Sequence, residues 1–361
     1  MGLVLDKVSR HVGGHVHLEN VSLSLERGSL NVLLGPTLSG KTSLMRLMAG
    51  LDVPSAGRVL VDGVDVTGRH VRERSVAMVY QQFINYPSLT VYENIASPLR
   101  VARRPKDEID RKVREAARLL KLEPYLERAP QQLSGGQQQR TAIARALAKE
   151  ARLLLLDEPL VNLDYKLREE LRTELRALFE RRGAVVVYST TEPLEALTMG
   201  GSVLVMHEGR VLQAGPTAQV YHHPASEAVA EVFSDPPMNL VSVEVKGGMA
   251  RFPQGLELPL TGHLGTLEDG SYRFGIRALH LALRPKPGLP SLPARVELAD
   301  ISGSETFVHV HAEALDWVVQ EEGVHEHGLG EKVTVYLDPT RLYAFGPDGM
   351  VRAAPVRGRG G

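Results

Sequence analysis

The sequence contains no cysteine and carries a formal net charge of only -1. The absence of cysteine excludes disulfide bonds and zinc–thiolate centres, and it agrees with a reducing compartment. A nearly neutral chain offers no general attraction to nucleic acid or to an acidic membrane surface. No apolar run approaches the roughly 18 residues that a membrane-spanning helix needs, and Met1 to Arg10 lack the pattern of a signal peptide. We therefore expect a soluble, cytoplasmic chain that reaches a membrane only through a partner.

The pattern of the sequence changes near the segment SDPPMN, residues 234–239. Before it, compact apolar runs alternate with amphipathic stretches, such as the run 153–156 between patterns that predict helices over 140–147 and 165–182. Strand, helix and strand in this order predict an α/β domain over residues 1–235 with parallel strand pairing.

After residue 235, short alternating runs replace the helical patterns, as in VELADISGSETFVHV at 296–310. Alternation of apolar and polar residues is typical of strands with one buried face, so we expect a small antiparallel barrel or sandwich. We predict that this second domain spans 236–361 and that its tail, 355–361, is disordered.

The octapeptide GPTLSGKT, residues 35–42, matches the pattern G-x-x-x-x-G-K-[ST]. Glycines in such a loop let successive backbone N–H groups turn inward around phosphate oxygens, and the next helix points its N-terminus at the anion. Lys41 is expected to meet the outer phosphates, and the Thr42 hydroxyl is expected to bind magnesium. A chance match is the alternative, and it is disfavoured because an apolar strand precedes the loop and a helix follows it.

The stretch LLLLDEP, residues 153–159, predicts a buried strand that ends in two carboxylates. Ligands of α/β sheets bind at the carboxyl ends of the strands, so Asp157 and Glu158 are candidates for the same phosphate site. An aspartate there can hold magnesium through water, and a neighbouring glutamate can polarise the attacking water. Taken alone, this segment is equally compatible with a solvated acidic turn.

The segment LSGGQQQR, residues 133–140, stands just before a predicted helix. The three motifs GPTLSGKT, LSGGQQQR and LLLLDEP follow one another in this order along the chain. This ordered set closely resembles the ATP-binding cassette family, the motor subunits of ABC transporters. The resemblance covers essentially the whole chain and implies an α/β fold, the P-loop NTPase ABC cassette. In this fold a mixed sheet with helices carries an antiparallel β subdomain and a helical subdomain, here near 86–150. It further implies a transport-coupled ATPase with ATP and Mg²⁺ as cofactors.

The resemblance also assigns residues to the site. Exposed N–H groups and a hydroxyl at the LSGGQ signature are expected to bind the γ-phosphate of ATP held by the other subunit of a head-to-tail dimer. The residues expected to hold this chain's own ATP are Val12, Gly35, Pro36, Thr37, Leu38, Ser39, Gly40, Lys41, Thr42 and Ser43, and those expected to act on the partner's ATP are Leu133, Ser134, Gly135, Gly136 and Gln137.

The segment MVYQQFINYPSLTVYENI, residues 78–95, resembles the family's Q-loop. Gln81 is therefore expected to reach magnesium and the attacking water, with Thr42 and Asp157 as the other magnesium ligands and Glu158 as the catalytic base. A solvated glutamine at a strand end is the alternative.

Two further segments resemble surfaces that contact other subunits. Tyr86 and Pro87 match the surface that receives the coupling helix of the membrane subunit, although an ordinary turn into a helix is the plainer interpretation. The segment LVNLDYKLR, residues 160–168, resembles the D-loop, which implies that Asp164 faces the partner subunit. Val161 stands where the family pattern predicts a serine.

The second domain resembles the small OB-like, all-β domain of importer ATPases that serve sugars, polyols and glycerol phosphate, on the basis of GIRALHLAL at 275–283 and the run 296–310. This resemblance implies a regulatory or dimerisation role for the domain. It also implies two transmembrane permease subunits, an indirect solute-binding protein and a place at the cytoplasmic face of the inner membrane. The sequence does not name the solute.

Three further positions depart from the family pattern. Aligning Glu195 and Ala196 with the family's V-T-H-D-x-x-E-A puts Thr191 where a histidine is expected. A histidine there bonds the γ-phosphate and orients the water, and a threonine hydroxyl reaches less far. Val12 replaces an aromatic residue that stacks on adenine, and Leu38 occupies a position that is usually small.

These departures leave several functions open. We favour pairing with a second, different ATPase subunit, in which the intact LSGGQ completes the partner's site while this chain's own site is weakened by Thr191. The alternatives are a homodimer that hydrolyses ATP slowly, a regulatory subunit that binds ATP without turnover, and a soluble relative acting in translation or DNA repair. The neutral charge and the β domain argue against the last.

Three histidine pairs with i, i+2 spacing place both rings on one face of a strand, which a metal ion can use. They are His15/His17, His309/His311 and His325/His327. Because no third ligand is evident in the sequence, we predict solvated or edge-strand histidines instead.

Overall fold

The computed structural model describes five stretches of the chain, residues 2–161, 163–181, 183–253, 255–313 and 315–356. The chain divides into two compact units, Met1–Thr217 and Ala218–Gly361. The predicted tail, 355–361, lies mostly outside the described residues. Within these stretches, no helix combines the length and the apolar character needed to cross a membrane.

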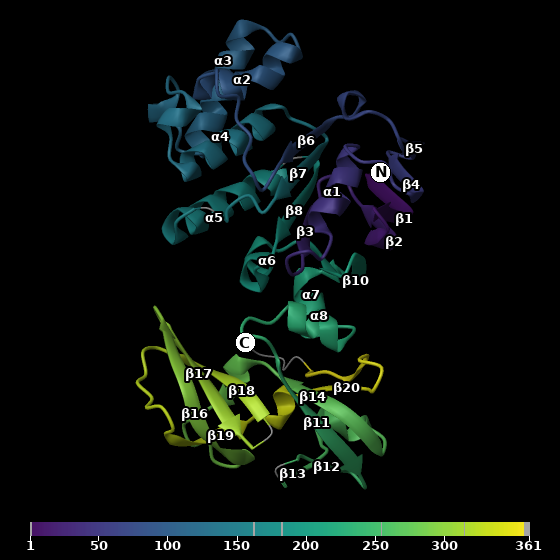
Figure 1. Ribbon diagram of the computed structural model, residues 1–361, viewed down its shortest axis with the longest axis vertical. Helices are drawn as coiled ribbons and strands as arrows, with labels where there is room; N and C mark the ends of the chain where they lie inside the picture. Colours follow the sequence, from purple (N-terminus) through teal and green to yellow (C-terminus); the bar gives the residue numbers. More distant parts are fainter. Residues whose placement is uncertain (1, 162, 182, 254, 314, 357–361) are drawn as a thin grey trace. The chain divides into compact units, whose positions relative to one another are not determined.

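A six-stranded mixed sheet forms the centre of the first unit, in the order β10-β9-β3-β8-β7-β6 (Figure 1). Its strands are β3 (Leu30–Leu34), β6 (Val76–Val79), β7 (Leu153–Asp157), β8 (Val185–Thr190), β9 (Ser202–His207) and β10 (Arg210–Pro216). All neighbours are parallel except β10, which runs antiparallel to β9. The predicted parallel pairing is therefore confirmed.

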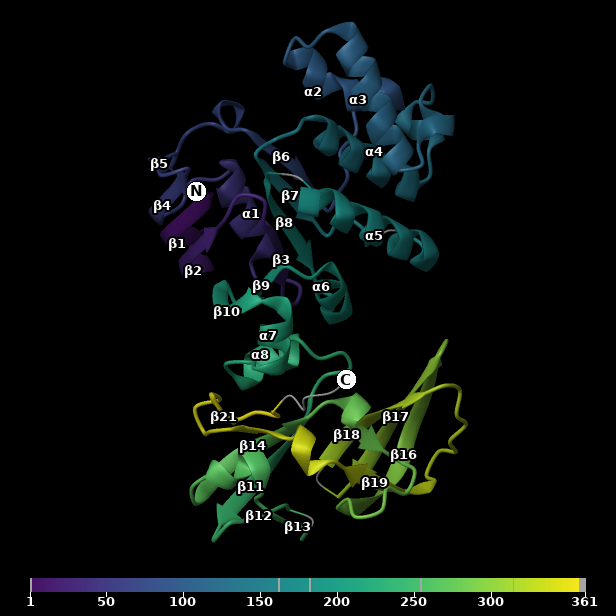
Figure 2. The same cartoon turned by 180° about the vertical axis from the view of Figure 1, so that it is seen from behind.

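Both faces of this sheet are covered, which explains why β3, β7 and β8 are continuous apolar runs. Helix α1 (Lys41–Ala49) lies on one side, and α5 (Tyr165–Arg181) and α6 (Pro193–Met199) lie on the other (Figures 1 and 2). Alternate residues of β7 and β8, such as Leu155 and Val187, are fully buried in a cluster that includes α1.

A separate antiparallel sheet, in the order β2-β1-β4-β5, joins the same apolar cluster as α1. Its strands are β1 (Leu3–Val12), β2 (His15–Leu25), β4 (Ala56–Val61) and β5 (Val64–Asp65). Between β4 and β5, Asp62 and Gly63 both have positive φ, 51° and 80°, as a two-residue hairpin turn of the Asp-Gly type requires.

Three helices pack together within the region 86–150, where we predicted a helical subdomain. They are α2 (Val91–Val101), α3 (Lys106–Leu119) and α4 (Gly135–Ala148). Helix α4 begins at Gly135, earlier than the predicted start near Arg140. The reason is a capping box, in which the Ser134 hydroxyl accepts a hydrogen bond from the Gln137 N–H and the Gln137 side chain accepts one from the Ser134 N–H.

The second unit contains two antiparallel sheets, in the orders β13-β12-β11-β14-β20-β21 and β15-β19-β16-β17-β18. The edge strands β15 and β18 of the five-stranded sheet contact each other, so this sheet is nearly closed and fits the OB-like, barrel-type domain that we expected. The strands are β11 (Asn239–Lys246), β12 (Met249–Arg251), β13 (Glu257–Pro259), β14 (Gly270–Ile276), β15 (Leu281–Ala282), β16 (Ser291–Ser302), β17 (Glu305–Ala312), β18 (Leu315–Glu322), β19 (Lys332–Leu337), β20 (Tyr343–Phe345) and β21 (Val351–Ala353).

The division between the units falls earlier than the boundary that we predicted after residue 235. Helices α7 (Thr217–His222) and α8 (Glu227–Val232) lie between the two positions. Arg277, only 4% exposed, holds α7 against the strands, because its guanidinium lies 3.8 Å from the centre of the Tyr221 ring and donates to the Tyr343 hydroxyl at 2.9 Å. Short 3₁₀ helices complete the chain at Val71–Glu73, Glu123–Tyr125, Pro130–Gln132, Gly262–Thr266, Ala278–His280 and Pro339–Arg341.

Replacing Leu155 by alanine should lower the free energy of unfolding by about 2–5 kcal/mol, because it leaves a cavity in the strand that carries Asp157. Urea denaturation followed by circular dichroism measures this change. Val101→Ala is the control, since Val101 is 85% exposed and its loss should change the value by no more than about 0.5 kcal/mol. Equal effects of the two variants would contradict the placement of β7 in the core.

Candidate functional site

The carboxyl ends of β3, β7 and β8 lie side by side at one edge of the mixed sheet, and the loops that follow them form the candidate site. The loop of residues 35–42 follows β3 and runs into α1. Gly35 is required there, because a Cβ would lie 2.3 Å from the Met206 carbonyl oxygen. Gly40, with φ of 100°, provides the left-handed turn that starts the helix.

The phosphate loop contains backbone N–H groups that donate no hydrogen bond to any described residue. Within the described part of the chain, the backbone N–H groups of Leu38, Gly40, Lys41 and Thr42 find no acceptor. Successive free N–H groups at the start of a helix form a concavity that attracts an anion. This arrangement is what the sequence predicted for the loop.

Two polar side chains of the same loop, those of Lys41 and Ser39, are buried. Lys41, 5% exposed, donates its Nζ to the carbonyl oxygens of Gly35 at 2.8 Å and Pro36 at 3.0 Å. Burial lowers the pKa of Lys41, and Glu158, whose carboxylate lies 3.6 Å away, acts in the opposite direction. The Ser39 hydroxyl is buried and has no partner among the described residues. An anion bound in the loop would give the Lys41 ammonium an opposite charge and the Ser39 hydroxyl a hydrogen-bond acceptor.

The predicted magnesium ligands Thr42 and Asp157 are in contact, because the Thr42 Oγ1 donates to Asp157 Oδ2 at 2.7 Å. The other carboxylate oxygen, Oδ1, accepts a hydrogen bond of 2.7 Å from Ser189 on β8. A hydroxyl and a carboxylate beside a phosphate cradle are the oxygen ligands that Mg²⁺ prefers, so the residues present fit this ion. Ser189 is a site residue that we did not predict, since only the pairing of β7 with β8 reveals that it lies opposite Asp157.

Two of the predicted catalytic side chains, those of Gln81 and Glu158, are in contact. Gln81 donates its Nε2 to Glu158 Oε2 at 3.0 Å, so these residues are brought together although they are far apart in the sequence. Glu158 has φ of 46°, a left-handed backbone conformation that directs its side chain toward Gln81 and Lys41. Gln81 contacts Glu158 rather than Asp157 or Thr42, so its predicted role as a magnesium ligand stays a prediction.

Thr191 follows the last residue of β8 and is exposed. Its hydroxyl has no hydrogen-bond partner in the part of the chain that the structure describes. The preceding Thr190 is buried and accepts a hydrogen bond from the Glu192 N–H, which shapes the turn. At the position that the alignment gives to the switch histidine, the chain therefore has a short side chain, which makes no hydrogen bond to the described residues.

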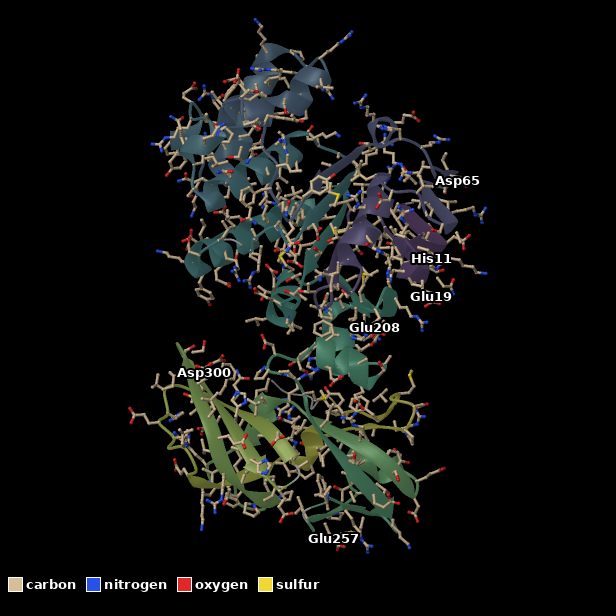
Figure 3. The ribbon with its side chains drawn as sticks, in the orientation of Figure 1. His11, Glu19, Asp65, Glu208, Glu257 and Asp300 are labelled. Atoms are coloured by element: carbon tan, nitrogen blue, oxygen red, sulfur yellow. The ribbon has the colours of Figure 1, made fainter. Side chains whose placement is uncertain are left out.

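The other two departures are also exposed. Leu38 is 95% exposed and has φ of 68°, a region where a residue with a Cβ is strained by about 1 kcal/mol or more, which explains why glycine is favoured there. Val12 is 44% exposed at the end of β1, and the neighbouring His11, labelled in Figure 3, is also exposed. Neither side chain offers an aromatic face for adenine.

The signature lies at the start of α4. Leu133 is buried, while Ser134 and Gly135 are exposed at the first turn. A Cβ on Gly135 would have only the Phe83 ring within 4 Å, at 3.9 Å, so the backbone here is open to a ligand.

Asp164 caps α5, since its Oδ1 accepts a hydrogen bond from the Leu167 N–H at 3.0 Å. One turn later, Arg168 connects two loops of the site. It donates to the Glu192 carboxylate at 2.8 Å, next to Thr191, and to the Val161 carbonyl at 3.3 Å. The D-loop and the turn that carries Thr191 are therefore joined by one guanidinium.

Tyr86 and Pro87, the predicted coupling surface, lie in the segment between β6 and α2. Both are exposed, and the Arg145 guanidinium lies 4.9 Å from the centre of the Tyr86 ring. Tyr86 and Arg145 line an open groove of about 580 Å³, together with Met78, Leu89, Pro98 and Val101. An apolar groove with an aromatic residue at its rim suits a helical segment of another protein.

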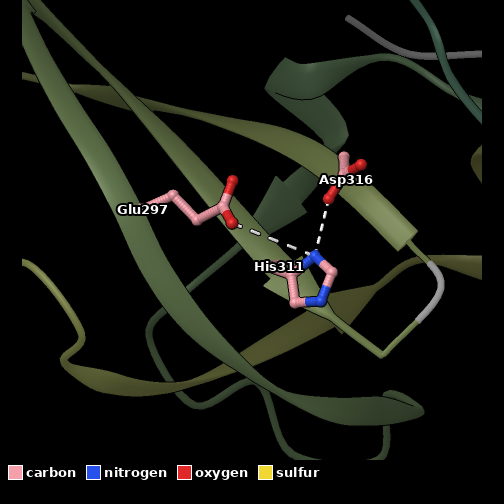
Figure 4. Close-up of side chains that lie close together, drawn as sticks. All are labelled: Glu297, His311 and Asp316. Carbon is pink, nitrogen blue, oxygen red and sulfur yellow. Dashed lines mark hydrogen bonds and ion pairs between the residues drawn. The ribbon is translucent and has the colours of Figure 1, made fainter.

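The histidine pairs of the sequence do not act as pairs. His311 on β17 donates to or accepts from Asp316 on β18 at 2.7 Å, and Glu297 on β16 lies 4.0 Å away (Figure 4). The hydrogen bond to Asp316 raises the pKa of His311. The sequence shows no third ligand for His311, whereas cross-strand neighbours supply two carboxylates in the structure. All three side chains are exposed, as in an ordinary surface ion pair, which agrees with the predicted solvated histidine.

Comparisons with known proteins agree with the order of the motifs. The profile of the family described as ABC transporter matches residues 18–161. The sn-glycerol-3-phosphate import ATP-binding protein UgpC of Paracoccus denitrificans is 36% identical over 347 residues, which cover 96% of this chain and 97% of that protein. An uncharacterized ABC transporter ATP-binding protein of Sinorhizobium fredii, y4oS, is 35% identical over 357 residues, or 98% of this chain and 95% of that protein.

A solved structure supports the same grouping. The dimeric structure of a post-hydrolysis state of the ATP-binding cassette MJ0796, bound to ADP and Pi, aligns with a TM-score of 0.55 and 31% identity. It covers 60% of this chain and 98% of that chain, so its likeness concerns about three fifths of this chain.

Behind the Thr191 turn, Glu195 is buried and accepts a hydrogen bond of 2.6 Å from the Tyr188 hydroxyl. Burial raises the pKa of Glu195 above its ordinary value of 4.5, while hydrogen bonds to Thr190 and Tyr188 act in the opposite direction. A raised pKa means that the folded state binds this proton more tightly than the unfolded state. The resulting stabilisation is complete below pH 4.5 and is lost as the pH rises through the folded pKa.

Glu195→Gln should therefore stabilise the protein by about 1 kcal/mol at pH 8, because the amide keeps the acceptor for Tyr188 without the buried charge. The difference between variant and wild type should shrink at pH 5. Chemical denaturation at both pH values measures it. A variant less stable than wild type at pH 8 would show that Glu195 is held as a carboxylate.

Proposed function

Because the chain belongs to the ATP-binding subunits of ABC transporters, we propose that it couples ATP binding and hydrolysis to the uptake of glycerol 3-phosphate or a related sugar or polyol. The solute class comes from relatives such as UgpC, whose name assigns sn-glycerol-3-phosphate import to that protein. The observation that carries the proposal is the set of N–H groups of Leu38, Gly40, Lys41 and Thr42 without an acceptor among the described residues, directly beside the contact between Thr42 and Asp157.

Different residues of the chain bind the phosphates, bind Mg²⁺ and activate the attacking water. The free N–H groups bind phosphate oxygens, and Lys41 exchanges the carbonyls of Gly35 and Pro36 for the outer phosphates. Mg²⁺, held by Thr42 and Asp157, supplies positive charge to the phosphate oxygens when bound. Glu158, aligned by Gln81, accepts a hydrogen bond from the attacking water.

The groove beside Tyr86 is the proposed docking surface for two transmembrane permease subunits, which receive solute from a binding protein outside the membrane. This assigns the chain to the cytoplasmic face of the inner membrane as a peripheral subunit. The exposed Ser134 and Gly135 are open to a second cassette, and the similar solved cassette MJ0796 is dimeric.

We further propose that the second cassette is a different ATPase subunit. Thr191 leaves this chain's own site without the imidazole of the family pattern, and loss of one transition-state contact costs about 10²–10³ in rate. The open signature at Ser134 completes the partner's site instead. A homodimer of this chain, or a subunit that binds ATP without turnover, is the competing outcome.

Thr191→His should raise the turnover of ATP at this chain's own site about 10²-fold when the chain is assembled with its partner cassette, because an imidazole can reach the γ-phosphate from this exposed position. Phosphate release under saturating ATP and Mg²⁺ measures the change. The double variant Thr191→His, Glu158→Gln is the control and should remain inactive at this site, since it lacks the base. An unchanged rate in the single variant would contradict a weakened site at Thr191.

The Glu158→Gln chain, which traps ATP by blocking hydrolysis, tests the partner. If the second cassette is a different subunit, this variant alone should stay monomeric in ATP and Mg²⁺ by sedimentation velocity, and it should associate when an ATPase subunit of the same transporter is added. A stable ATP-dependent dimer of the variant alone would establish the homodimer.

A further inference from the structure

Ser189 lies at the meeting point of the two carboxylates of the site. It is the residue before the last of β8, it is completely buried, and it pairs with Asp157 of β7 in parallel register. We propose that Ser189 is a positioning residue for ATP hydrolysis, whose one hydroxyl fixes the orientation of both Asp157 and Glu158. This inference rests on the ATP site proposed above.

The Ser189 hydroxyl first orients the carboxylate of Asp157. Ser189 Oγ donates to Asp157 Oδ1 at 2.7 Å, and Thr42 Oγ1 donates to Oδ2 at 2.7 Å. The carboxylate is 2% exposed, so its orientation is set by these two donors. If the Thr42 hydroxyl were to bind magnesium instead of Oδ2, the hydrogen bond from Ser189 would still hold Oδ1 of Asp157. A group that orients a metal-binding side chain in this way raises the affinity for the metal.

The Ser189 hydroxyl also binds the backbone of Glu158. The same Oγ accepts a hydrogen bond of 3.0 Å from the Glu158 N–H. Glu158 has φ of 46°, which is unfavourable for a residue with a Cβ, and this backbone conformation aims its carboxylate at Gln81 and Lys41. The Ser189 hydroxyl gives the N–H of this strained residue a partner and so stabilises the turn.

The environment of Ser189 argues that the hydroxyl is present for these two bonds. The preceding residues of β8, Val185, Val186 and Val187, are apolar and buried. A hydroxyl in such surroundings is costly unless it is hydrogen-bonded, and both partners of this hydroxyl belong to the proposed catalytic machinery. In the alignment that places Thr191 at the histidine, the family motif has valine at position 189. The strand that lacks the imidazole therefore carries an added hydroxyl two residues earlier.

The test uses the full-length chain and compares Ser189→Ala with Ser189→Thr, which keeps the hydroxyl. A fluorescent ATP analogue is titrated at increasing Mg²⁺. Ser189→Ala should raise the Mg²⁺ concentration needed for half-maximal binding about 10-fold or more, while binding without Mg²⁺ changes less than about twofold. Ser189→Thr should restore wild-type values. Ser29→Ala is the matched control, because Ser29 Oγ donates to the Glu26 carbonyl at the opposite end of β3, away from the site.

A second measurement needs neither nucleotide nor activity. Hydrogen exchange of the Glu158 amide in the nucleotide-free chain should be faster in Ser189→Ala than in wild type or Ser189→Thr, because the amide loses its acceptor. Should the alanine variant fail to fold, Ser189→Cys, which keeps the size with a weaker hydrogen-bonding group, takes its place with the same expectations.

The outcomes separate the two proposals. A wild-type chain that binds no ATP analogue at any Mg²⁺ concentration overturns the proposed function, and the role of Ser189 with it. A wild-type chain that binds the analogue, with the same Mg²⁺ dependence and the same Glu158 exchange in Ser189→Ala, overturns the role of Ser189 alone. A shift in Mg²⁺ dependence that also appears in Ser29→Ala shows a general loss of stability and overturns it as well.

Discussion

The site depends on one constraint, the parallel alignment of β3, β7 and β8. Parallel strands end at the same edge of a sheet, so the groups that follow each strand are delivered to one place. The free N–H groups of the loop after β3, the carboxylates at the end of β7 and the hydroxyl of Ser189 on β8 meet there. Both faces of the sheet are buried, which keeps these strand ends in fixed register.

The unusual residues of the chain lie at this same edge. Leu38 stands at a left-handed position of the phosphate loop, Thr191 replaces the imidazole, and Ser189 adds a buried hydroxyl. The carboxylate of Glu158 nevertheless lies against both Lys41 and Gln81.

Arg168 connects two loops of the site. Its guanidinium joins the Val161 carbonyl of the D-loop to the Glu192 carboxylate beside Thr191. A partner that contacts Asp164, one turn away, therefore acts on a segment that is bonded to the Thr191 turn. In the second unit, Arg277 has a comparable structural role, since it is buried between Tyr221 and Tyr343 and holds α7 to the strands.

Local patterns in the sequence were sufficient for the phosphate loop, the carboxylate-bearing strand, the signature and the change to a β domain, because each depends on residue types at fixed spacing. The alignment with the family motif predicts Thr191 at the position of the switch histidine, and this assignment stays a prediction. Three features required the tertiary structure: the hydroxyl of Ser189 on Asp157, the approach of Gln81 to Glu158 and the carboxylates around His311. Each depends on which strands or loops become neighbours, and strand order is decided by the burial of whole faces, which spacing along the chain does not reveal.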